Sequence, residues 1–204
     1  MTRRVGVLGG TFDPIHRGHL EPLLSVASEL NWDRIILVPA FHQPFKNGGS
    51  VSPCHRFVMT VLASQQDPRV YVSPVEIDRG SISFTVETLE ALSEIHAGDS
   101  LEWVIGDDNL GELHRWKRID EIFEMANMIV MRREGEALRG DPAIMDRIHA
   151  ISGRPNAGAL VVASNEIVRV SSTEIRDRVR RGLSVSDLVD ASVDSYMNRY
   201  SLYL

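Results

Sequence analysis

The run from Val5 to His19 constrains the fold more than any other part of the sequence. Val5 to Leu8 is a short apolar segment bounded by glycine, which is typical of a buried strand in a parallel sheet. Gly9, Gly10 and Asp13-Pro14 follow, and Asp-Pro indicates a turn because proline fixes φ and removes a backbone donor. Apolar residues then recur at helical spacing, at Leu20, Leu23, Leu24, Ala27 and Leu30. The run therefore predicts a strand, a glycine-rich loop and a helix in direct succession.

This succession suits an anionic ligand. Gly9 and Gly10 lack a Cβ, so a ligand can approach the backbone closely. The first N–H groups of the helix and its dipole favour negative charge at the same place. His16 and His19 stand three residues apart and share a face if the chain is already helical there. A glycine pair after a strand is usually structural, and so is a single histidine at a helix start. The complete string is more specific and predicts two imidazoles that donate hydrogen bonds to phosphate oxygens.

Composition excludes several other classes of protein. The 204 residues are 43% hydrophobic, enough for a substantial core, and predict one domain over 1–204 with a C-terminal helical part over 171–204. The single cysteine, Cys54, excludes an internal disulfide and argues against a cysteine-rich metal site. We find no signal peptide and no apolar run of membrane length, so we expect a cytoplasmic protein without a membrane partner. The net charge of -6 argues against nucleic acid as a partner.

The remaining chain alternates between predicted strands and helices, which predicts a parallel sheet with helices on both faces. A helix starts at Ser52-Pro53, where serine is the expected N-cap, and we assign it a buried face of Phe57, Val58, Val61 and Leu62. Arg56 could point into the cleft, but an exposed arginine is the default expectation. Residues 185–204 suggest two short helices. Further strands are predicted at Arg34–Pro39, Val70–Val72, Leu101–Ile105, Asn127–Met131 and Ala159–Ala163.

Four later segments carry candidate binding residues. The long loop 40–52 holds Lys46, a phosphate contact or a solvated lysine. Gly106 follows a strand and allows close approach to the backbone, before Asp107 and Asp108. Trp116 stands among polar residues, so we expect it to be partly exposed. The spacing of Ser171 and Glu174 is that of a capping box and predicts a helix start with a second anion site.

Two of these strings are specific enough to suggest a family. Gly9-Gly10-Thr11-Phe12-Asp13-Pro14-x-His16-x-Gly18-His19 resembles the signature of the H-x-G-H nucleotidyltransferase superfamily, and most resembles bacterial nicotinate-mononucleotide adenylyltransferases. Ser171-Ser172-Thr173-x-Ile175-Arg176 resembles the ATP-phosphate motif of that family. Ser83-Phe84-Thr85-x-x-Thr88-Leu89 resembles its Ser-Tyr-Thr-x-x-Thr-Leu segment. The resemblance covers nearly the whole chain and implies a Rossmann-like α/β nucleotidyltransferase fold.

The resemblance also implies a role for each candidate. His16 and His19 would be catalytic, and Thr85 and Trp116 would bind the pyridine nucleotide. Ser83 or Thr85 could cap the helix that starts there, a role compatible with binding. No protein side chain is expected to bind metal; Mg²⁺ would be carried on the ATP phosphates. Phe45 stands where the family has histidine, and Glu134 where it has proline. The implied ATP-binding residues are Gly9, Gly10, Thr11, Phe12, Gly18, Lys46, Gly106, Asp108, Ser171, Ser172, Thr173 and Arg176.

The implied activity is transfer of the adenylyl group of ATP to nicotinate mononucleotide, giving deamido-NAD and pyrophosphate. The sequence leaves three alternatives open. The acceptor could be the amide, nicotinamide mononucleotide. The chemistry could be cytidylyl transfer to another small phosphate. The chain could also be a nucleotide-binding sensor that keeps the fold without turnover. A homo-oligomer is equally left open.

Overall fold

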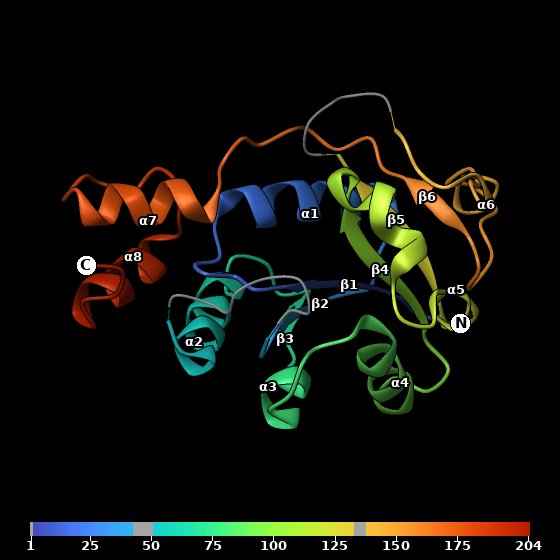
Figure 1. The fold of residues 1–204 in the computed structure, drawn as a ribbon, viewed down its shortest axis with the longest axis horizontal. Coiled ribbons are helices and arrows are strands. Elements are labelled where there is room, and N and C mark those ends of the chain that lie inside the picture. The colour runs from blue at the N-terminus through green and yellow to red at the C-terminus, as the bar shows by residue number, and fades with distance from the viewer. Residues whose placement is uncertain (1, 43–50, 133–137) are drawn as a thin grey trace.

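The structure is a computed structural model that describes residues 2–42, 51–132 and 138–204. The described strands form one parallel sheet in the order β3-β2-β1-β4-β5-β6, which lies between two layers of helices (Figure 1). The strands are β1 (Arg4–Gly10), β2 (Arg34–Pro39), β3 (Val70–Val72), β4 (Ser100–Gly106), β5 (Ala126–Met131) and β6 (Leu160–Val162).

The helices connect these strands and follow the last one. They are α1 (Arg17–Glu29), α2 (Pro53–Ser64), α3 (Val75–Arg79), α4 (Thr85–Ile95), the 3-10 helix η1 (Asp107–Arg115), α5 (Ile119–Met125), α6 (Pro142–Met145), α7 (Ser172–Arg180) and α8 (Ala191–Arg199). Every strand predicted from the sequence is present, with bounds that differ by at most one or two residues.

The strand order places a binding site at one edge of the sheet. The chain runs outward from β1 through β2 to β3, then returns to pair β4 with the other side of β1. Ligands in such sheets bind where the strand order reverses, beyond the carboxyl ends of the strands. Here that point lies beyond Gly10 of β1 and Gly106 of β4. The prediction of a Rossmann-like α/β fold with a parallel sheet is confirmed.

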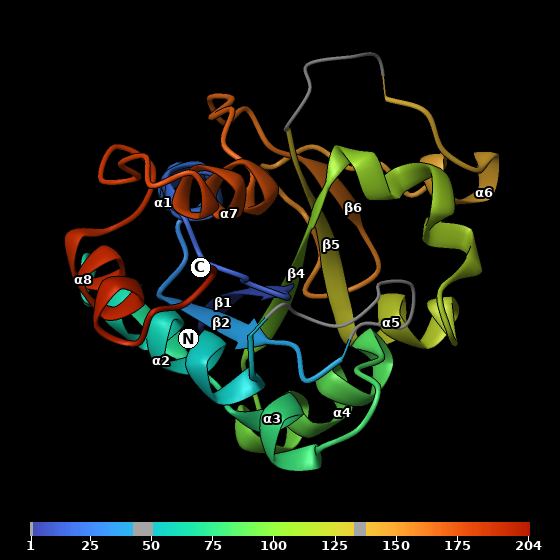
Figure 2. The ribbon, with the colours of Figure 1, turned by 60° about the vertical axis from the view of Figure 1, so that its left-hand side comes forward.

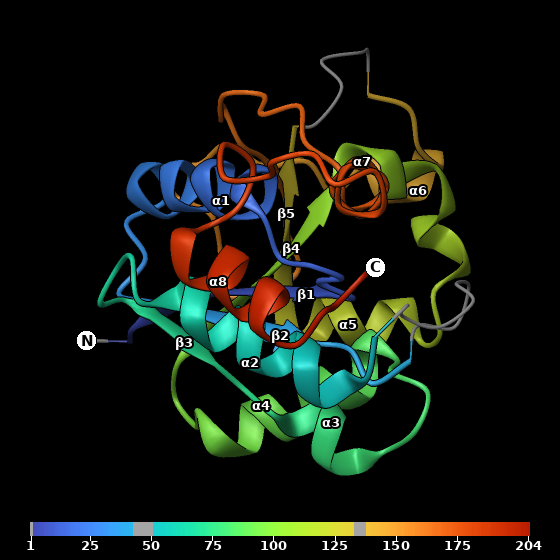
Figure 3. The ribbon, with the colours of Figure 1, turned by 90° about the vertical axis from the view of Figure 1, so that its left-hand side faces the viewer.

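Alternating side chains divide the core into two clusters. On β1, Leu8 belongs to the cluster covered by α1, α2, α7 and α8, whereas Val5 and Val7 belong to the cluster covered by α4 and α5. Figures 2 and 3 show α1 and α7 on the same side of the sheet, with α3 and α4 on the opposite side. The C-terminal helices thus share a core with the first helix, and the predicted domain organisation stays a prediction.

The face that α2 buries differs from the prediction. Met59 and Ala63 are buried, and Arg56 is only 1% exposed, whereas Val58 is 36% exposed. The reason is that Arg56 finds carbonyl acceptors inside the molecule, at Thr11 and Phe41, and this turns the helix about its axis. Hydrophobic periodicity cannot anticipate a buried arginine with backbone partners.

The C-terminal stretch also differs from the prediction. Residues 185–204 hold one α-helix, α8, instead of two, and the residues before it form turns. These turns bury Val185, Leu188 and Val189 in the same core cluster as α1. Apolar residues that pack from a turn produce the same sequence pattern as a short helix, which explains the difference.

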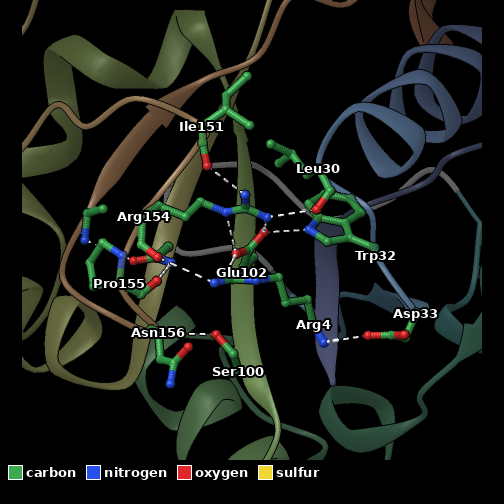
Figure 4. A network of polar contacts seen from close by, with 12 residues as sticks. Arg4, Leu30, Trp32, Asp33, Ser100, Glu102, Ile151, Arg154, Pro155 and Asn156 are labelled. Atoms are coloured by element: carbon green, nitrogen blue, oxygen red, sulfur yellow. Dashed lines mark hydrogen bonds and ion pairs between the residues drawn. The ribbon is translucent and has the colours of Figure 1, made fainter. Parts of the chain in front are cut away.

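A buried carboxylate joins distant parts of the chain at the other end of β4 (Figure 4). Glu102 is fully buried, and its oxygens accept hydrogen bonds from Trp32 Nε1 at 2.5 Å, Arg4 Nη1 at 2.5 Å and Arg154 Nε at 2.8 Å. Arg154 also donates to the carbonyl oxygens of Leu30 and Ile151. The network links β1, β4, the end of α1 and the segment before β6.

Candidate active site

A cavity of about 490 Å³ lies beyond the carboxyl ends of β1 and β4, where the topology places a ligand. Its wall combines strand ends, the loop that follows β1, the first turn of α7, and the segments around α3, α4 and η1. The lining residues are Leu8, Gly9, Gly10, Thr11, Phe12, His19, Ala40, Glu76, Ser83, Phe84, Thr85, Trp103, Val104, Ile105, Gly106, Asp108, Asn109, Arg115, Trp116, Lys117, Ile122 and Ser172.

The two glycines at the end of β1 make room for aromatic rings. A Cβ on Gly9 would lie 2.7 Å from the Trp103 ring, and one on Gly10 would lie 2.7 Å from the Phe12 ring. Both rings line the cavity, so the glycines let them come close to the backbone at its edge. Phe12 itself takes a left-handed backbone conformation, with φ of 49°. Non-glycine residues in this region concentrate at functional sites because surrounding contacts must hold them there.

The two histidines lie against each other at the start of α1. His16 is the N-cap and His19 is the third helical residue; their rings are stacked with centroids 3.7 Å apart. The backbone N–H of His16 donates to Nδ1 of His19 at 3.3 Å. A neutral His19 ring therefore carries its proton on Nε2, which makes that atom a donor. His19 lines the cavity, whereas His16 is 5% exposed and lies outside the lining.

A second helix N-terminus meets the first. Ser171 is the N-cap of α7, and its hydroxyl accepts from the Glu174 N–H at 3.2 Å, as the capping-box spacing predicts. Ser172 lines the cavity and donates to the Pro14 carbonyl oxygen at 3.0 Å. A Cβ on Gly18 would lie 3.1 Å from the Val170 carbonyl oxygen, so glycine permits this approach of the two helix starts. The amide groups of α1 and α7 thus favour anions in one region.

The opposite wall carries the residues predicted to bind a pyridine ring. Thr85 is the first residue of α4, and its N-cap is Phe84, which makes no side-chain cap. The alternative that Ser83 or Thr85 caps the helix is therefore wrong. Trp116 is half-buried between η1 and α5, as expected. Lys117 Nζ lies 4.3 Å from the centre of the Phe84 ring.

The predicted segment after β4 begins η1. Gly106 is the N-cap of η1, and both Gly106 and Asp108 line the cavity. Asp108 Oδ1 accepts from Asn109 Nδ2 at 3.0 Å. Asp107 instead forms an ion pair with Arg132 at 3.2 Å. Among the residues described in this structure, no group of three or more His, Cys, Asp or Glu side chains is placed to hold a metal ion.

Two buried charged residues at the site were not predicted. Glu76 lines the cavity, is 4% exposed, and accepts from the Thr88 hydroxyl at 2.6 Å. Burial raises the pKa of its carboxyl group. Arg56 donates to the Thr11 carbonyl oxygen at 2.5 Å, and burial lowers the pKa of its guanidinium. A single charged residue within a polar stretch gives no sequence signal for such a position.

The cavity therefore gathers ten of the predicted site residues, and these are Gly9, Gly10, Thr11, Phe12, His19, Thr85, Gly106, Asp108, Trp116 and Ser172. His16, Gly18, Ser171, Thr173 and Arg176 lie outside its lining. The guanidinium of Arg176 donates to the Asp13 carbonyl oxygen at 2.8 Å and to the Thr173 hydroxyl at 3.2 Å. Lys46 lies outside the described residues. The ligand roles of all of these residues stay predictions.

No helix in the described ranges combines the length and the apolar character needed to span a membrane.

Comparison with known proteins gives consistent results. Residues 7–178 match the family model described as cytidylyltransferase-like. Curated relatives named "Probable nicotinate-nucleotide adenylyltransferase" are 34% identical in Leifsonia xyli, over 98% of this chain and 94% of the relative, and 36% identical in Saccharopolyspora erythraea, over 98% and 90%. A relative of the same name from Mycobacterium tuberculosis is 35% identical over 98% of this chain and 91% of its own length.

Solved structures share the fold. Plasmodium falciparum nicotinic acid mononucleotide adenylyltransferase complexed with NaAD superposes with a TM-score of 0.72 at 18% identity, and covers 98% of this chain and 97% of its own. The same enzyme complexed with APC gives a TM-score of 0.71 at 16% identity, with the same coverage. At this identity the likeness concerns the fold alone.

Proposed function

The chain belongs to the cytidylyltransferase-like family and, within it, to the nicotinate-nucleotide adenylyltransferases. From this premise we propose that it transfers the adenylyl group of ATP to nicotinate mononucleotide and so forms deamido-NAD and pyrophosphate. The observation that carries the proposal is the cavity, whose lining combines His19 and Ser172 from two helix starts with the aromatic residues Phe84, Trp103 and Trp116. One end of this cavity suits phosphates and the other suits a flat ring.

The proposed reaction is a direct displacement. An oxygen of the 5′-phosphate of nicotinate mononucleotide attacks the α-phosphorus of ATP and forms a new P–O bond. The bond between the α-phosphorus and the bridging oxygen to the β-phosphate breaks, and pyrophosphate leaves with the electron pair. Such a transfer runs on positioning and charge stabilisation and requires no covalent enzyme intermediate. The amide donors proposed for the phosphates come mainly from the start of α7, because the first amide of α1, the Arg17 N–H, donates to the Leu188 carbonyl oxygen; the dipole of α1 adds a favourable field.

His19 is proposed to stabilise the charge that develops on the transferring phosphate. Its Nδ1 accepts a hydrogen bond from the His16 backbone, so a neutral ring carries its proton on Nε2, the nitrogen proposed to donate to the phosphate. His16 is proposed to hold this ring by stacking on it, with centroids 3.7 Å apart. A fixed donor of this kind costs no reorganisation when the charge appears.

The pyridine ring is proposed to lie between Trp116 and the start of α4. The electron-poor nicotinate ring suits the face of an indole. Thr85 lies on the same cavity wall and would orient the ring through its hydroxyl or amide group. The names of the curated relatives favour the acid over the amide as acceptor.

Mg²⁺ is proposed to arrive on the ATP phosphates as part of the substrate, where it neutralises the leaving pyrophosphate. Magnesium keeps several waters and needs few protein ligands in such sites, so no side chain of this protein is assigned to it. We also propose a cytoplasmic protein that binds no nucleic acid and no membrane, in keeping with the net charge of -6. The proposed reaction does not depend on whether the protein forms a homo-oligomer.

Isotopic labelling tests the reaction type. With nicotinate mononucleotide and Mg²⁺, label from the α-phosphate of ATP is expected in the dinucleotide, and label from the γ-phosphate in pyrophosphate. The same reaction with CTP is expected to be much slower. Transfer of the γ-label to the acceptor would indicate a kinase, and a preference for CTP would indicate cytidylyl transfer.

A further inference from the structure

The loop between β1 and α1 is held in place by remote parts of the chain. The Thr11 carbonyl oxygen accepts from Arg56 Nη1 of α2 at 2.5 Å. The carbonyl oxygen of Asp13 accepts from Arg176 of α7 at 2.8 Å, and the N–H of Arg17 donates to the Leu188 carbonyl oxygen at 2.9 Å. The loop that carries Phe12 and leads to His16 is therefore held by α2 and also by Arg176 and Leu188, whose contacts form only when the C-terminal part has docked.

A further contact to this loop comes from Tyr203. The Tyr203 hydroxyl donates to Oδ1 of Asp13 at 2.8 Å, across 190 positions of sequence. The bond is dry, since Tyr203 is 7% exposed and Asp13 is 6% exposed. A hydrogen bond to a carboxylate is stronger than one between neutral groups, and its loss in a buried place leaves an acceptor unsatisfied.

The backbone after α8 is bent unfavourably to make this contact. Ser201 has φ of 50° and Tyr203 has φ of 68°, although neither is glycine. Such conformations are unfavourable for residues with a side chain and persist only where other contacts compensate for them. The result is that the Tyr203 ring enters the core cluster that also contains Phe12 and Ile15, while Leu204 stays 82% exposed.

The surroundings of Asp13 keep Tyr203 as the donor and Asp13 as the acceptor of this hydrogen bond. Burial and the neighbouring Asp13 carboxylate raise the pKa of the Tyr203 hydroxyl, so the phenol keeps its proton and remains the donor. Arg176 Nη1 lies 4.0 Å from Oδ2 of Asp13, on the other carboxylate oxygen. The side chain of Asp13 is thus held between Tyr203 and Arg176.

A movement of Asp13 would shift its neighbour Phe12 and, with it, the His19 ring that is predicted to be catalytic. Asp13 follows Phe12, whose ring meets His19 edge-on with centroids 5.2 Å apart. Phe12 is 2% exposed and has a strained backbone, so it cannot shift without moving this contact. An error of about 1 Å in the placement of a catalytic group costs up to roughly 100-fold in rate.

We propose that Tyr203 is a positioning residue for adenylyl transfer, which fixes Asp13 and, through Phe12, the place of His19 beside the transferring phosphate. The effect on turnover rests on the proposed function, whereas the effect of Tyr203 on the position of the loop does not. It gives Tyr203, which does not itself line the cavity, a part in setting turnover.

The test compares Tyr203→Phe, which removes one oxygen, with Tyr200→Phe as the matched control. Tyr200 is 50% exposed and packs on His55 and Tyr196, away from the loop. Tyr203→Phe is expected to lower kcat roughly tenfold while KM for either substrate changes by less than about twofold. Amide hydrogen exchange in the peptide covering residues 11–19 is expected to become faster. Tyr200→Phe is expected to match the wild type in all three measurements.

A double-mutant cycle separates positioning from general destabilisation. If Tyr203 acts through Asp13, adding Tyr203→Phe to Asp13→Ala lowers kcat no further; independent roles would multiply the two losses. The cycle is measured at a temperature where circular dichroism shows every variant folded. Wild-type kcat in Tyr203→Phe, or unchanged exchange over residues 11–19, would overturn the inference. A wild-type protein without turnover would overturn the proposed function, and the exchange comparison would still decide whether Tyr203 fixes the loop.

Discussion

His19 is the residue whose surroundings define its chemistry most narrowly. The His16 N–H occupies its Nδ1, the Phe12 ring meets it edge-on, and its remaining edge faces the cavity. These contacts fix both the tautomer and the orientation of the ring. A donor with these properties is useful in the transition state and contributes little to the stability of the fold.

We therefore expect His19→Ala to lower kcat by roughly 100- to 1,000-fold, the usual effect of removing a donor to developing charge. The melting temperature should change little, since His19 is only half-buried. His114→Ala is the matched control, because His114 is exposed on η1 and does not line the cavity. Near-normal turnover in His19→Ala would show that another group stabilises the charge.

The buried Glu76 should make the free energy of unfolding depend on pH. Its raised pKa means that the native protein holds this proton more tightly than the unfolded chain does. The free energy of unfolding should therefore fall as pH rises above the ordinary value of 4.5, until the native carboxyl group has also lost its proton. Glu76→Gln has no such proton, so its stability relative to the wild type should increase with pH.

Urea unfolding at about pH 5 and about pH 8 measures this difference. Glu94→Gln serves as the control, because Glu94 is exposed on α4 and its loss removes a carboxyl group only from the surface. A constant difference between Glu76→Gln and the wild type at both pH values would contradict a raised pKa at this position.

The sequence identified the residues of the motifs but not the charged residues behind them. His19, Thr85 and Trp116 were predicted because they stand in strings with a known order. Arg56 and Glu76 stand in ordinary helical or polar contexts, and their burial depends on partners such as the Thr11 carbonyl oxygen and the Thr88 hydroxyl. Those partners are set by tertiary packing, which a single sequence does not display.

Among the secondary-structure elements, the junction of η1 and α5 carries the ring-binding role. Trp116 lies there, half-buried, on the wall that also holds Thr85. Trp116→Ala is expected to raise KM for nicotinate mononucleotide roughly tenfold, in line with the loss of one stacked aromatic pair. KM for ATP should change by less than about twofold. Trp116→Phe should retain most of the affinity, whereas a selective loss of ATP affinity in Trp116→Ala would contradict the stacking role.

The opposite end of β4 serves stability instead. Arg154 has a side chain only 7% exposed and pairs with the fully buried Glu102 (Figure 4). Removing Arg154 takes one of two charged partners from the buried Glu102 and one donor from the carbonyl oxygens of Leu30 and Ile151, so Arg154→Met should lower the free energy of unfolding by roughly 3 kcal/mol. Arg180→Met breaks an exposed pair with Asp177 and should cost less than about 1 kcal/mol. Equal effects in urea unfolding would show that the network contributes no more than a surface pair.

Element type was predictable where the pattern was local, and element orientation was not. Each short apolar run with turn signals became a strand of the parallel sheet. The start of α7 followed from Ser171 and Glu174, and the helix ends shortly before Gly182, which has φ of 67°. The buried face of α2 was wrong because Arg56 turns inward, and α3 was missed because its five residues are too few for a helical period.

At the scale of the whole molecule, the topology explains why the site lies where it does. The reversal between β1 and β4 opens a space beyond Gly10 and Gly106, and α7 returns from the C-terminal part to complete it. The parallel sheet and its two helical layers followed from the order of elements. The contacts that assemble the site, such as Tyr203 with Asp13, join residues too far apart in the sequence for local patterns to predict.

The measurement that tests the account most directly is kcat/KM for pyrophosphate release with ATP and Mg²⁺, compared between nicotinate mononucleotide and its amide. The account predicts release with both histidines intact and a strong preference for the acid. Equal or faster release with the amide would keep the mechanism and contradict the acceptor. No release with either acceptor, from protein that is folded, would contradict the proposed activity itself.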